Sequence, residues 1–207
     1  MKNAETFWDK AAKKYAKSPI KNMTAYNETL KHTRGSLSED DKVLEVGCGT
    51  GSTALLLAAN VKQITATDIS SNMIEIAKSK AVDQNVNNVT FIKSTLFDDS
   101  LEIGSFDVIL AFNFLHLLED IPLATRRINE LLKPEGLFIS KTICMGEKFT
   151  FWPFIIYVMQ KIGLAPYVKF LKTRELEELI AAESFQITKT GSYPPSPPSR
   201  FIIATKT

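Results

Sequence analysis

The chain has 207 residues, which is enough for one sizeable folded domain and too few for two full ones. Its composition, 44% hydrophobic and 23% charged residues, is typical of a globular protein and excludes a disordered or fibrous chain. The formal net charge of +2 gives no reason to expect a polyanionic partner, and two cysteines are too few for a disulfide scaffold.

The first half of the chain alternates short strand-like runs with helical patterns. Residues 42–46 form an apolar run that ends at a glycine, and they predict a buried strand. A helix is expected over residues 52–59 and a second strand over residues 63–68. Ser70 or Ser71 can cap the next helix, because both precede apolar residues at helical spacing. A third strand is then expected over residues 89–92.

The second half continues the same alternation. Residues 106–112 form a near-continuous apolar run, as in a strand covered on both faces. Asp120 can cap the following helix, which we expect to end at a proline–glycine turn over residues 133–136. A fifth strand is predicted over residues 137–144, and Thr173 opens the last helix. Two closing strands are predicted over residues 185–190 and 201–205.

These elements predict an α/β fold. Strands separated by helices form βαβ units, so the seven strands should make one mostly parallel sheet with helices on both faces. The last two strands are joined by the short, proline-rich residues 191–199, which favours an antiparallel hairpin. We therefore expect an antiparallel last strand near one edge of the sheet.

A glycine-rich loop, residues 47–51, follows the first strand and precedes a helix. Glycines there permit a tight turn and let a ligand approach the backbone, while the helix start directs free N–H groups toward an anionic group. Asp68 ends the second strand, where a carboxylate can accept hydrogen bonds from both hydroxyls of a ribose. Glu45 would repel a pyrophosphate and suits an ammonium group. S-adenosyl-L-methionine carries all three features, namely ribose, carboxylate and ammonium.

VLEVGCGTGS resembles motif I of the class I S-adenosylmethionine-dependent methyltransferases. ATDISSNMIEIAK, SFDVILAFNFLHLLED and INELLKPEGLFIS resemble later segments of that family, and FWDKAAKKYAK resembles the N-terminal helix of small-molecule members related to its quinone-methylating branch. The resemblance is strong over residues 43–144. It implies a Rossmann-like fold and methyl transfer from S-adenosyl-L-methionine to a small molecule, with S-adenosyl-L-homocysteine as the product.

The resemblance also implies which residues hold the cofactor. Glu45 would lie near the amino group, Asp68 would hold the ribose, and Tyr15 would close over the methionine end. Other residues expected at the cofactor are Gly47, Cys48, Gly49, Thr50 and Gly51 in the loop, Ile69 and Met73 beside the adenine, and Asn113 near the reacting centre.

One segment departs from the family pattern. After the third strand the family commonly has Gly-Asp-Ala, whose aspartate accepts a hydrogen bond from the adenine amino group. Ser94, Thr95 and Leu96 stand in that place here. Thr95 and Leu96 are still expected at the cofactor, with Thr95 making a weaker bond or Asp98 substituting for the missing acid.

His116 is the candidate catalytic residue, because it follows the fourth strand closely and a neutral imidazole suits a general base. The alternative is a histidine that only packs beneath its loop. His32 lies in a polar stretch and is expected at the surface. The sequence shows no metal-ligand cluster, so no metal is expected.

The substrate side is less defined. Residues 146–172 are too long and too apolar for a simple loop and should form helices broken at prolines. Phe114, Trp152, Tyr157 and Tyr193 are the candidates for contacting a small-molecule substrate, apolar or aromatic in character. The same segment could instead pack as core, or touch a membrane transiently to reach a lipid such as a quinone precursor.

Localisation and partners follow from what the sequence lacks. The polar, lysine-rich N-terminus does not resemble a signal peptide, and the longest uncharged runs are shorter than the roughly 20 residues that span a bilayer. We expect a cytoplasmic protein, monomer or homodimer, with no transmembrane segment. The segment after the fourth strand lacks Asn/Asp-Pro-Pro-Tyr/Phe, so no nucleic-acid partner is expected.

Residues 1–207 are expected to form a single methyltransferase domain, with a helical cap over residues 1–42 and a helical insertion over residues 146–172 on the substrate side. Two rival functions stay open at this level. One is a non-catalytic S-adenosylmethionine-binding or scaffold protein. The other is a nicotinamide-dependent oxidoreductase, which the glycine spacing G-x-G-x-G disfavours because a dinucleotide fold prefers G-x-G-x-x-G.

Overall fold

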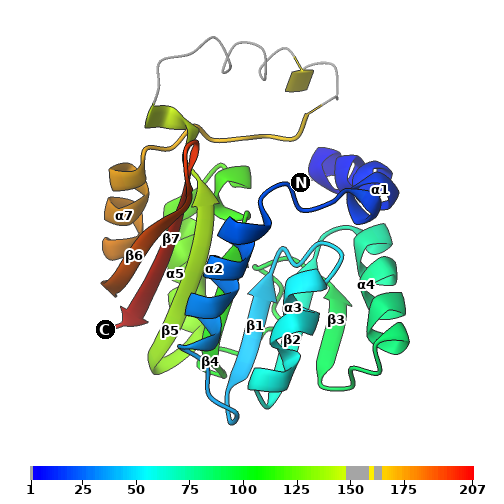
Figure 1. Cartoon of the computed structure of the whole chain (residues 1–207). Helices are drawn as coiled ribbons and strands as arrows, with labels where there is room; N and C mark the ends of the chain where they lie inside the picture. Colours follow the sequence, from blue (N-terminus) through cyan, green and yellow to red (C-terminus); the bar gives the residue numbers. More distant parts are fainter. Residues whose placement is uncertain (1, 148–158, 161–164) are drawn as a thin grey trace.

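A computed structural model of the chain describes residues 2–147, 159–160 and 165–207 (Figure 1). Its centre is a seven-stranded sheet in the order β3-β2-β1-β4-β5-β7-β6. The strands are β1 (Lys42–Val46), β2 (Gln63–Asp68), β3 (Val89–Lys93), β4 (Phe106–Phe112), β5 (Leu132–Ile143), β6 (Phe185–Pro195) and β7 (Pro198–Lys206).

The strand directions confirm the predicted fold class. β1 to β5 are parallel, whereas β7 is antiparallel to both of its neighbours, β5 and β6. The strand order reverses between β1 and β4, which lie side by side at the centre of the sheet. In open α/β sheets ligands bind outside the carboxyl ends of the strands at such a switch point.

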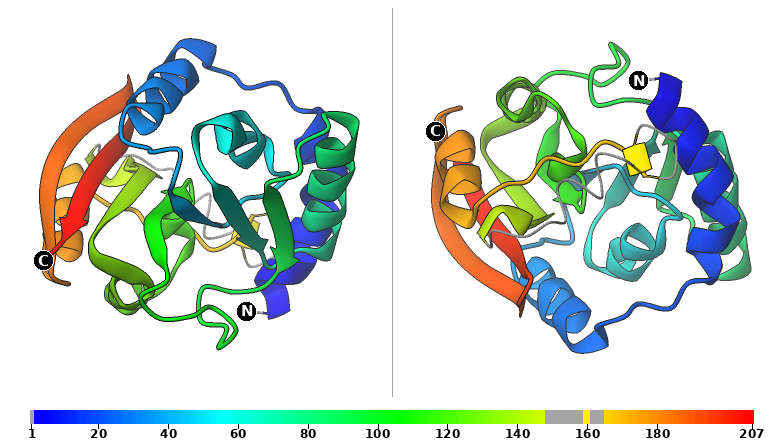
Figure 2. Two further views of the ribbon diagram at one scale, coloured as in Figure 1. Left: turned by 90° about the horizontal axis from the view of Figure 1, so that it is seen from below. Right: turned by 90° about the horizontal axis from the view of Figure 1, so that it is seen from above.

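Helices cover both faces of the sheet (Figure 2). The helices are α1 (Lys2–Lys17), α2 (Met23–Arg34), α3 (Ser52–Leu57), α4 (Ser71–Asp83), α5 (Ile121–Leu131) and α7 (Thr173–Ala181), with short 3₁₀ turns η1 (Ala58–Asn60), η2 (Leu115–Leu117) and η3 (Met145–Glu147). α2, α3 and α4 pack on one face, and α5 and α7 on the other. α1 packs on α4 beside the carboxyl ends of the strands (Figure 1).

Two cores follow from the alternation of side chains along the strands. On β1, Val43 points into the core under α2, α3 and α4, and Leu44 points into the core under α5 and α7. Both are fully buried, as the apolar run predicts. Burial of each such side chain stabilises the fold by roughly 1.5–3 kcal/mol, so the sheet centre is a rigid platform for its carboxyl edge.

The predicted capping residues are confirmed, whereas β5 and β7 begin earlier than the predicted residues 137 and 201. Ser70 caps α4 by accepting a hydrogen bond from the Met73 N–H, and Asp120 caps α5 by accepting one from the Leu123 N–H. The predicted helix over 52–59 is shorter, because α3 passes into the 3₁₀ turn η1 after Leu57.

Two predicted connections belong instead to strands. The expected turn over residues 133–136 lies within β5, where Leu132 pairs with Phe106 and the extra residues bulge before Leu137 pairs with Val108. The expected link over residues 191–199 continues the hairpin up to the pair Pro195 and Pro198. Proline lacks an N–H donor, so it is tolerated at such a strand end.

Candidate functional site

The glycine-rich loop joins β1 to α3 at the carboxyl edge of the sheet. Gly47, Gly49 and Gly51 all have positive φ, between +54° and +73°. A Cβ on Gly51 would meet the Phe91 ring at 2.6 Å, so that glycine is required for packing. A Cβ on Gly49 would meet nothing closer than the Tyr15 ring at 3.8 Å. Gly49 is therefore the part of the loop whose backbone a ligand can approach.

The back of the loop is fixed by α4. Lys80 Nζ donates hydrogen bonds to the Thr50 carbonyl at 3.1 Å, the Thr50 hydroxyl at 2.9 Å and the Ser52 hydroxyl at 3.0 Å. The Cys48 N–H donates to the Thr67 carbonyl at 2.9 Å. Thr50 and Cys48 are both buried, and burial raises the pKa of the Cys48 thiol. These two residues fix the conformation of the loop, whereas Gly49 offers its backbone to a ligand.

Glu45 is a buried acid near the end of β1. Only 3% of its surface is exposed, and Oε2 has no hydrogen-bond partner among the described residues. The Ala54 N–H, in the first turn of α3, donates to the carboxylate. Burial, together with the nearby charge of Asp68, outweighs that bond and raises the pKa of Glu45 to about 8. The site thus contains an acceptor oxygen that a cationic group could satisfy.

Asp68 ends β2 and connects it to the glycine loop. Its Oδ2 accepts a hydrogen bond from the Gly49 N–H and its Oδ1 accepts one from the Ser70 N–H, both at 2.9 Å. Burial raises the pKa of Asp68, and these backbone bonds oppose the rise. Each carboxylate oxygen has a second lone pair, so Asp68 can still accept hydrogen bonds from a ligand.

α1 places Tyr15 over the loop. Asp9 accepts hydrogen bonds from the Ser70 hydroxyl at 2.6 Å and the Asn72 N–H at 3.1 Å, which attach α1 to the start of α4. The pKa of Tyr15 is raised by burial and then by the charges of Asp68 and Glu45. The structure therefore brings Tyr15, Gly49, Asp68 and Glu45 together, as the sequence predicts.

The residues predicted at the adenine lie after β2 and β3. Ile69 is partly buried, Met73 is 2% exposed, and Leu96 is 3% exposed within the core under α5. The Thr95 hydroxyl accepts a hydrogen bond from the Phe97 N–H at 3.2 Å within its own turn. Among these, Ile69 and Thr95 have accessible surface for a ligand, and the adenine contacts stay predictions.

The segment after β4 also reaches the loop. The Phe114 ring packs so closely on Gly47 that a Cβ there would lie 2.5 Å from it. Asn113 is exposed with φ +53°, and its N–H donates to the Lys141 carbonyl at 2.7 Å. Phe114 and Asn113 therefore lie at the carboxyl edge, which is compatible with their predicted roles.

His116 lies in η2 and is 7% exposed. Burial lowers its pKa to about 4, so the imidazole is neutral at pH 7. Its Nδ1 has no hydrogen-bond partner among the described residues, and nothing described there orients the ring. Its role as a general base stays a prediction.

The predicted substrate residues are only partly described. Trp152 and Tyr157, and most of the predicted insertion over residues 146–172, lie outside the described residues. Tyr193 lies on β6, and its hydroxyl is 2.9 Å from His32 Nε2 on α2. His32, expected at the surface, is instead only partly exposed, and its ring packs against the rings of Tyr193 and Phe201.

The structure adds two residues that the sequence reasoning missed. Tyr26 on α2 lies near the site, because its hydroxyl is 3.2 Å from Thr53 Oγ1 and the charge of Glu45 contributes to its raised pKa. Lys141 is a 9% exposed lysine near the end of β5. A lysine within the apolar run of that strand was a visible signal, whereas nothing local distinguishes Tyr26.

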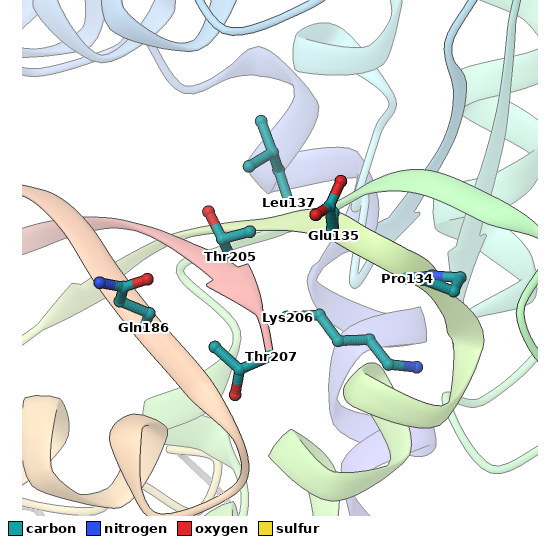
Figure 3. A pocket seen from close by; sticks show the side chains of 7 residues that line it. All are labelled: Pro134, Glu135, Leu137, Gln186, Thr205, Lys206 and Thr207. Carbon is teal, nitrogen blue, oxygen red and sulfur yellow. The ribbon is translucent and has the colours of Figure 1, made fainter.

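A surface pocket of about 610 Å³ lies elsewhere, at the opposite end of the sheet (Figure 3). It is lined by residues of β5, β6 and β7 together with Thr207, including Glu135, Gln186 and Lys206. The ammonium of Lys206 is already bonded to the carbonyls of Asn129 and Leu132. We assign the site to the loop edge because its buried acids and accessible glycine lie there.

Within residues 2–147, 159–160 and 165–207 no three His, Cys, Asp or Glu side chains are grouped to hold a metal ion. In the same part of the chain no helix has the length and apolar character needed to cross a bilayer.

Comparison with known proteins finds similarity to methyltransferases. The pattern of the family described as "Methyltransferase domain" matches residues 44–140. The "Uncharacterized methyltransferase YcgJ" of Bacillus subtilis is 32% identical over 100 residues, which make up 48% of this chain and 40% of that protein. The "Ubiquinone biosynthesis O-methyltransferase" of Rickettsia akari is 28% identical over 176 residues, 82% of this chain and 68% of that protein.

Solved structures share the fold. The crystal structure of YcgJ matches with a TM-score of 0.71 and 18% identity over 87% of this chain and 98% of that one. Geranyl diphosphate C-methyltransferase from Streptomyces coelicolor, solved with S-adenosyl-L-homocysteine, matches with a TM-score of 0.75 and 14% identity over 89% of this chain and 79% of that one. The sequence matches are to methyltransferases, and the solved structures show that the chain has the same fold as these proteins. The chain spans less than half of the length of YcgJ in the sequence match.

Proposed function

We propose that this protein transfers a methyl group from S-adenosyl-L-methionine to a small-molecule acceptor. The observation that carries the proposal is the buried, unpartnered Oε2 of Glu45 beside the accessible backbone of Gly49. An orphaned carboxylate oxygen suits the ammonium of the methionine part, because a buried acid without a partner is costly.

The other residues fit the same ligand. Asp68 retains lone pairs for the ribose hydroxyls, and the Tyr15 ring covers the loop from α1. Ile69 and Thr95 are available toward the adenine. Relatives whose printed names include methyltransferase, and a neighbour solved with S-adenosyl-L-homocysteine, support the same cofactor and product.

When bound, the cofactor supplies a sulfonium methyl group for in-line displacement by the acceptor. The chain's own task is then to hold both reactants in line and to exclude water. Glu45 and Asp68 fix the two polar ends of the cofactor, and Tyr15 shields it. A general base is needed only if the acceptor atom carries a proton of high pKa, and the neutral His116 is our candidate.

We also propose a cytoplasmic location and a single domain over residues 1–207. Cys48 and Cys144 are free and buried, which suits a reducing compartment. The acceptor is proposed to be a small molecule rather than a nucleic acid.

Isothermal titration with S-adenosyl-L-homocysteine tests the proposal. The wild type should bind, and Asp68→Ala should weaken binding by at least tenfold because the ribose contacts and the Gly49 anchor are lost. Asp83→Ala, which removes an acid at the far end of α4, is the matched control and should bind as the wild type does. Equal affinity in Asp68→Ala would contradict the site.

Turnover is measured separately, as methyl-labelled product formed from a panel of small-molecule acceptors. Binding of S-adenosyl-L-homocysteine without turnover on any acceptor would favour the non-catalytic binding protein instead.

A further inference from the structure

Lys141 is a largely buried residue whose ammonium has no counter-charge among the described residues. It lies near the carboxyl end of β5, in register with Phe112 on β4 and Phe201 on β7, and is 9% exposed. No described residue forms a hydrogen bond or ion pair with its ammonium. Burial alone lowers its pKa, with no acid contributing. Most of the side chain is buried, yet Nζ is not among the fully buried atoms that lack a partner, so the ammonium keeps accessible surface at this edge. A partly desolvated ammonium without a bond to a described residue does not stabilise the fold, so stability does not explain this lysine.

Lys141 shares a sheet face with Glu45. Ile139 and Phe201, its neighbours on that face, belong to the core under α2, α3 and α4, and Glu45 alternates with Leu44 and Val46 of the opposite core. Glu45 pairs with Leu110, two residues before Phe112, the partner of Lys141. One face of the carboxyl edge therefore holds a buried acid on β1 and a buried base on β5.

The two groups do not neutralise each other. β4 separates β1 from β5, so their backbones lie two strand spacings apart, about 10 Å. Lys141 is absent from the causes of the Glu45 pKa shift, and Glu45 is absent from those of Lys141. The buried Oε2 of Glu45 and the accessible ammonium of Lys141 are therefore each free to bind a separate group, and β4 with Phe112 lies between them.

This separation fits two reactants lying side by side. In the proposed function Glu45 holds the ammonium of the cofactor, so the acceptor must lie beyond the sulfonium, across β4. Phe112 is partly exposed there and offers an apolar surface, and Asn113, whose N–H bonds the Lys141 carbonyl, follows it. Lys141 is then at the far side of the acceptor.

We propose that Lys141 binds an anionic oxygen of the methyl acceptor, a carboxylate or an ionised phenol, whose apolar body lies against Phe112. The acceptor is thus an apolar or aromatic acid. This inference rests on the proposed function and gives its substrate class. Lys141 acts as a specificity residue, and the methyl-accepting atom lies on the side of the molecule that faces β1.

The test uses the full chain saturated with S-adenosyl-L-homocysteine. Matched pairs of acid and methyl ester, 3-hydroxybenzoate with its ester and 4-hydroxyphenylacetate with its ester, are titrated calorimetrically. The wild type should bind each acid at least tenfold more tightly than its ester. Lys141→Met should lose that preference while its affinity for the esters and for S-adenosyl-L-homocysteine stays unchanged.

Two controls separate the alternatives. Lys31→Met removes an exposed charge on α2 and should keep the preference for acids. The melting temperature of ligand-free Lys141→Met should be equal to or above that of the wild type, because a methionine carries no buried charge. A lower melting temperature would show that Lys141 has a structural partner and would overturn the assignment.

The remaining outcomes are equally decisive. A wild type without preference for acids, including one that binds no member of the panel, overturns the inference. So does a Lys141→Met variant that keeps the preference or loses affinity for S-adenosyl-L-homocysteine. If the wild type does not bind S-adenosyl-L-homocysteine at all, the proposed function itself fails, and the inference falls with it.

Discussion

Single residues of the site carry free-energy costs that only a ligand removes. Glu45 is the clearest example, since its raised pKa means that ionisation is less favourable in the folded state than in the unfolded one. The sign follows directly: stability falls as the pH rises from the ordinary glutamate range to about 8, because the unfolded chain loses this proton first.

Glu45→Gln should therefore raise the stability of the ligand-free protein at pH 7. The removed cost is on the order of 3 kcal/mol, which corresponds to several degrees in melting temperature for a chain of this size. The same variant should bind S-adenosyl-L-homocysteine at least tenfold more weakly. Thermal unfolding and titration together check this, and a lower melting temperature would contradict the assigned burial cost.

Cofactor binding should also release a proton from Glu45. At pH 7 a carboxyl with a pKa of about 8 is mostly protonated, and an ammonium beside it favours the carboxylate. Titrations in buffers of different ionisation enthalpy should therefore show release of close to one proton in the wild type. In Glu45→Gln that contribution should be absent, and equal proton release in both proteins would rule out this residue.

At the scale of elements, the glycine-rich loop and α1 position these residues. Two glycines of the loop serve different purposes. Gly51 packs against Phe91 and Ala77, whereas a Cβ on Gly49 would meet only the distant Tyr15 ring, which leaves its backbone open to a ligand. Replacing each by alanine therefore tests binding and packing independently.

Gly51→Ala should lower the melting temperature strongly, because its Cβ would lie 2.6 Å from Phe91 and 2.8 Å from the Ala77 Cβ. Gly49→Ala should lower the free energy of unfolding only by the strain of its positive φ, on the order of 1–2 kcal/mol. It should nevertheless weaken cofactor binding by tenfold or more. Melting temperatures and calorimetric titration of both variants distinguish the packing role of Gly51 from the binding role of Gly49. Equal melting temperatures would show that the two glycines have the same role.

α1 is held to α4 chiefly through Asp9. Asp9→Ala removes the bonds from the Ser70 hydroxyl and the Asn72 N–H. It leaves the bond from the Asn72 side-chain amide to the Asp9 carbonyl and the exposed pair of Glu5 with Lys93, which contributes little. Trypsin should then cleave the lysines of α1 about tenfold faster, since local opening costs less. Asp83→Ala should digest like the wild type, and unchanged cleavage in Asp9→Ala would refute this attachment.

Much of this arrangement is predictable from local patterns. β1, the loop and β2 follow from an apolar run, clustered glycines and a terminal acid, so Glu45, Gly49 and Asp68 were identifiable. That Glu45 Oε2 and the Lys141 ammonium have no partner among the described residues was not predictable, because it depends on which side chains the neighbouring strands bring alongside. Tyr26 was missed for a similar reason, since its place near Glu45 depends on how α2 packs across the sheet.

For the whole molecule, two buried groups give opposite pH dependences. His116 has a lowered pKa, so the unfolded chain binds its proton first and stability falls as the pH drops from 6.5 to about 4. Glu45 acts in the opposite direction over the overlapping range below pH 8. Between pH 7 and 5 each effect is on the order of 2 kcal/mol, so they nearly cancel in the wild type.

Variants that remove one titrating group should reveal the pH dependence of stability that the other group causes. On acidification from pH 7 to 5 the melting temperature of Glu45→Gln should fall relative to the wild type, and that of His116→Gln should rise. Thermal unfolding of the three proteins at both pH values checks this. Parallel curves for all three would show that neither group titrates as described.

Ser70 connects the parts of this site in a way that bears on timing. Its N–H donates to Asp68, its hydroxyl donates to Asp9, and the same oxygen accepts the Met73 N–H at the start of α4. One residue thus links Asp68, α1 and the cap of α4. Departure of α1 would break the bond between the Ser70 hydroxyl and Asp9, and the same hydroxyl caps α4. In the proposed function we therefore expect the uncovering of the cofactor and the loosening of the start of α4 to occur together.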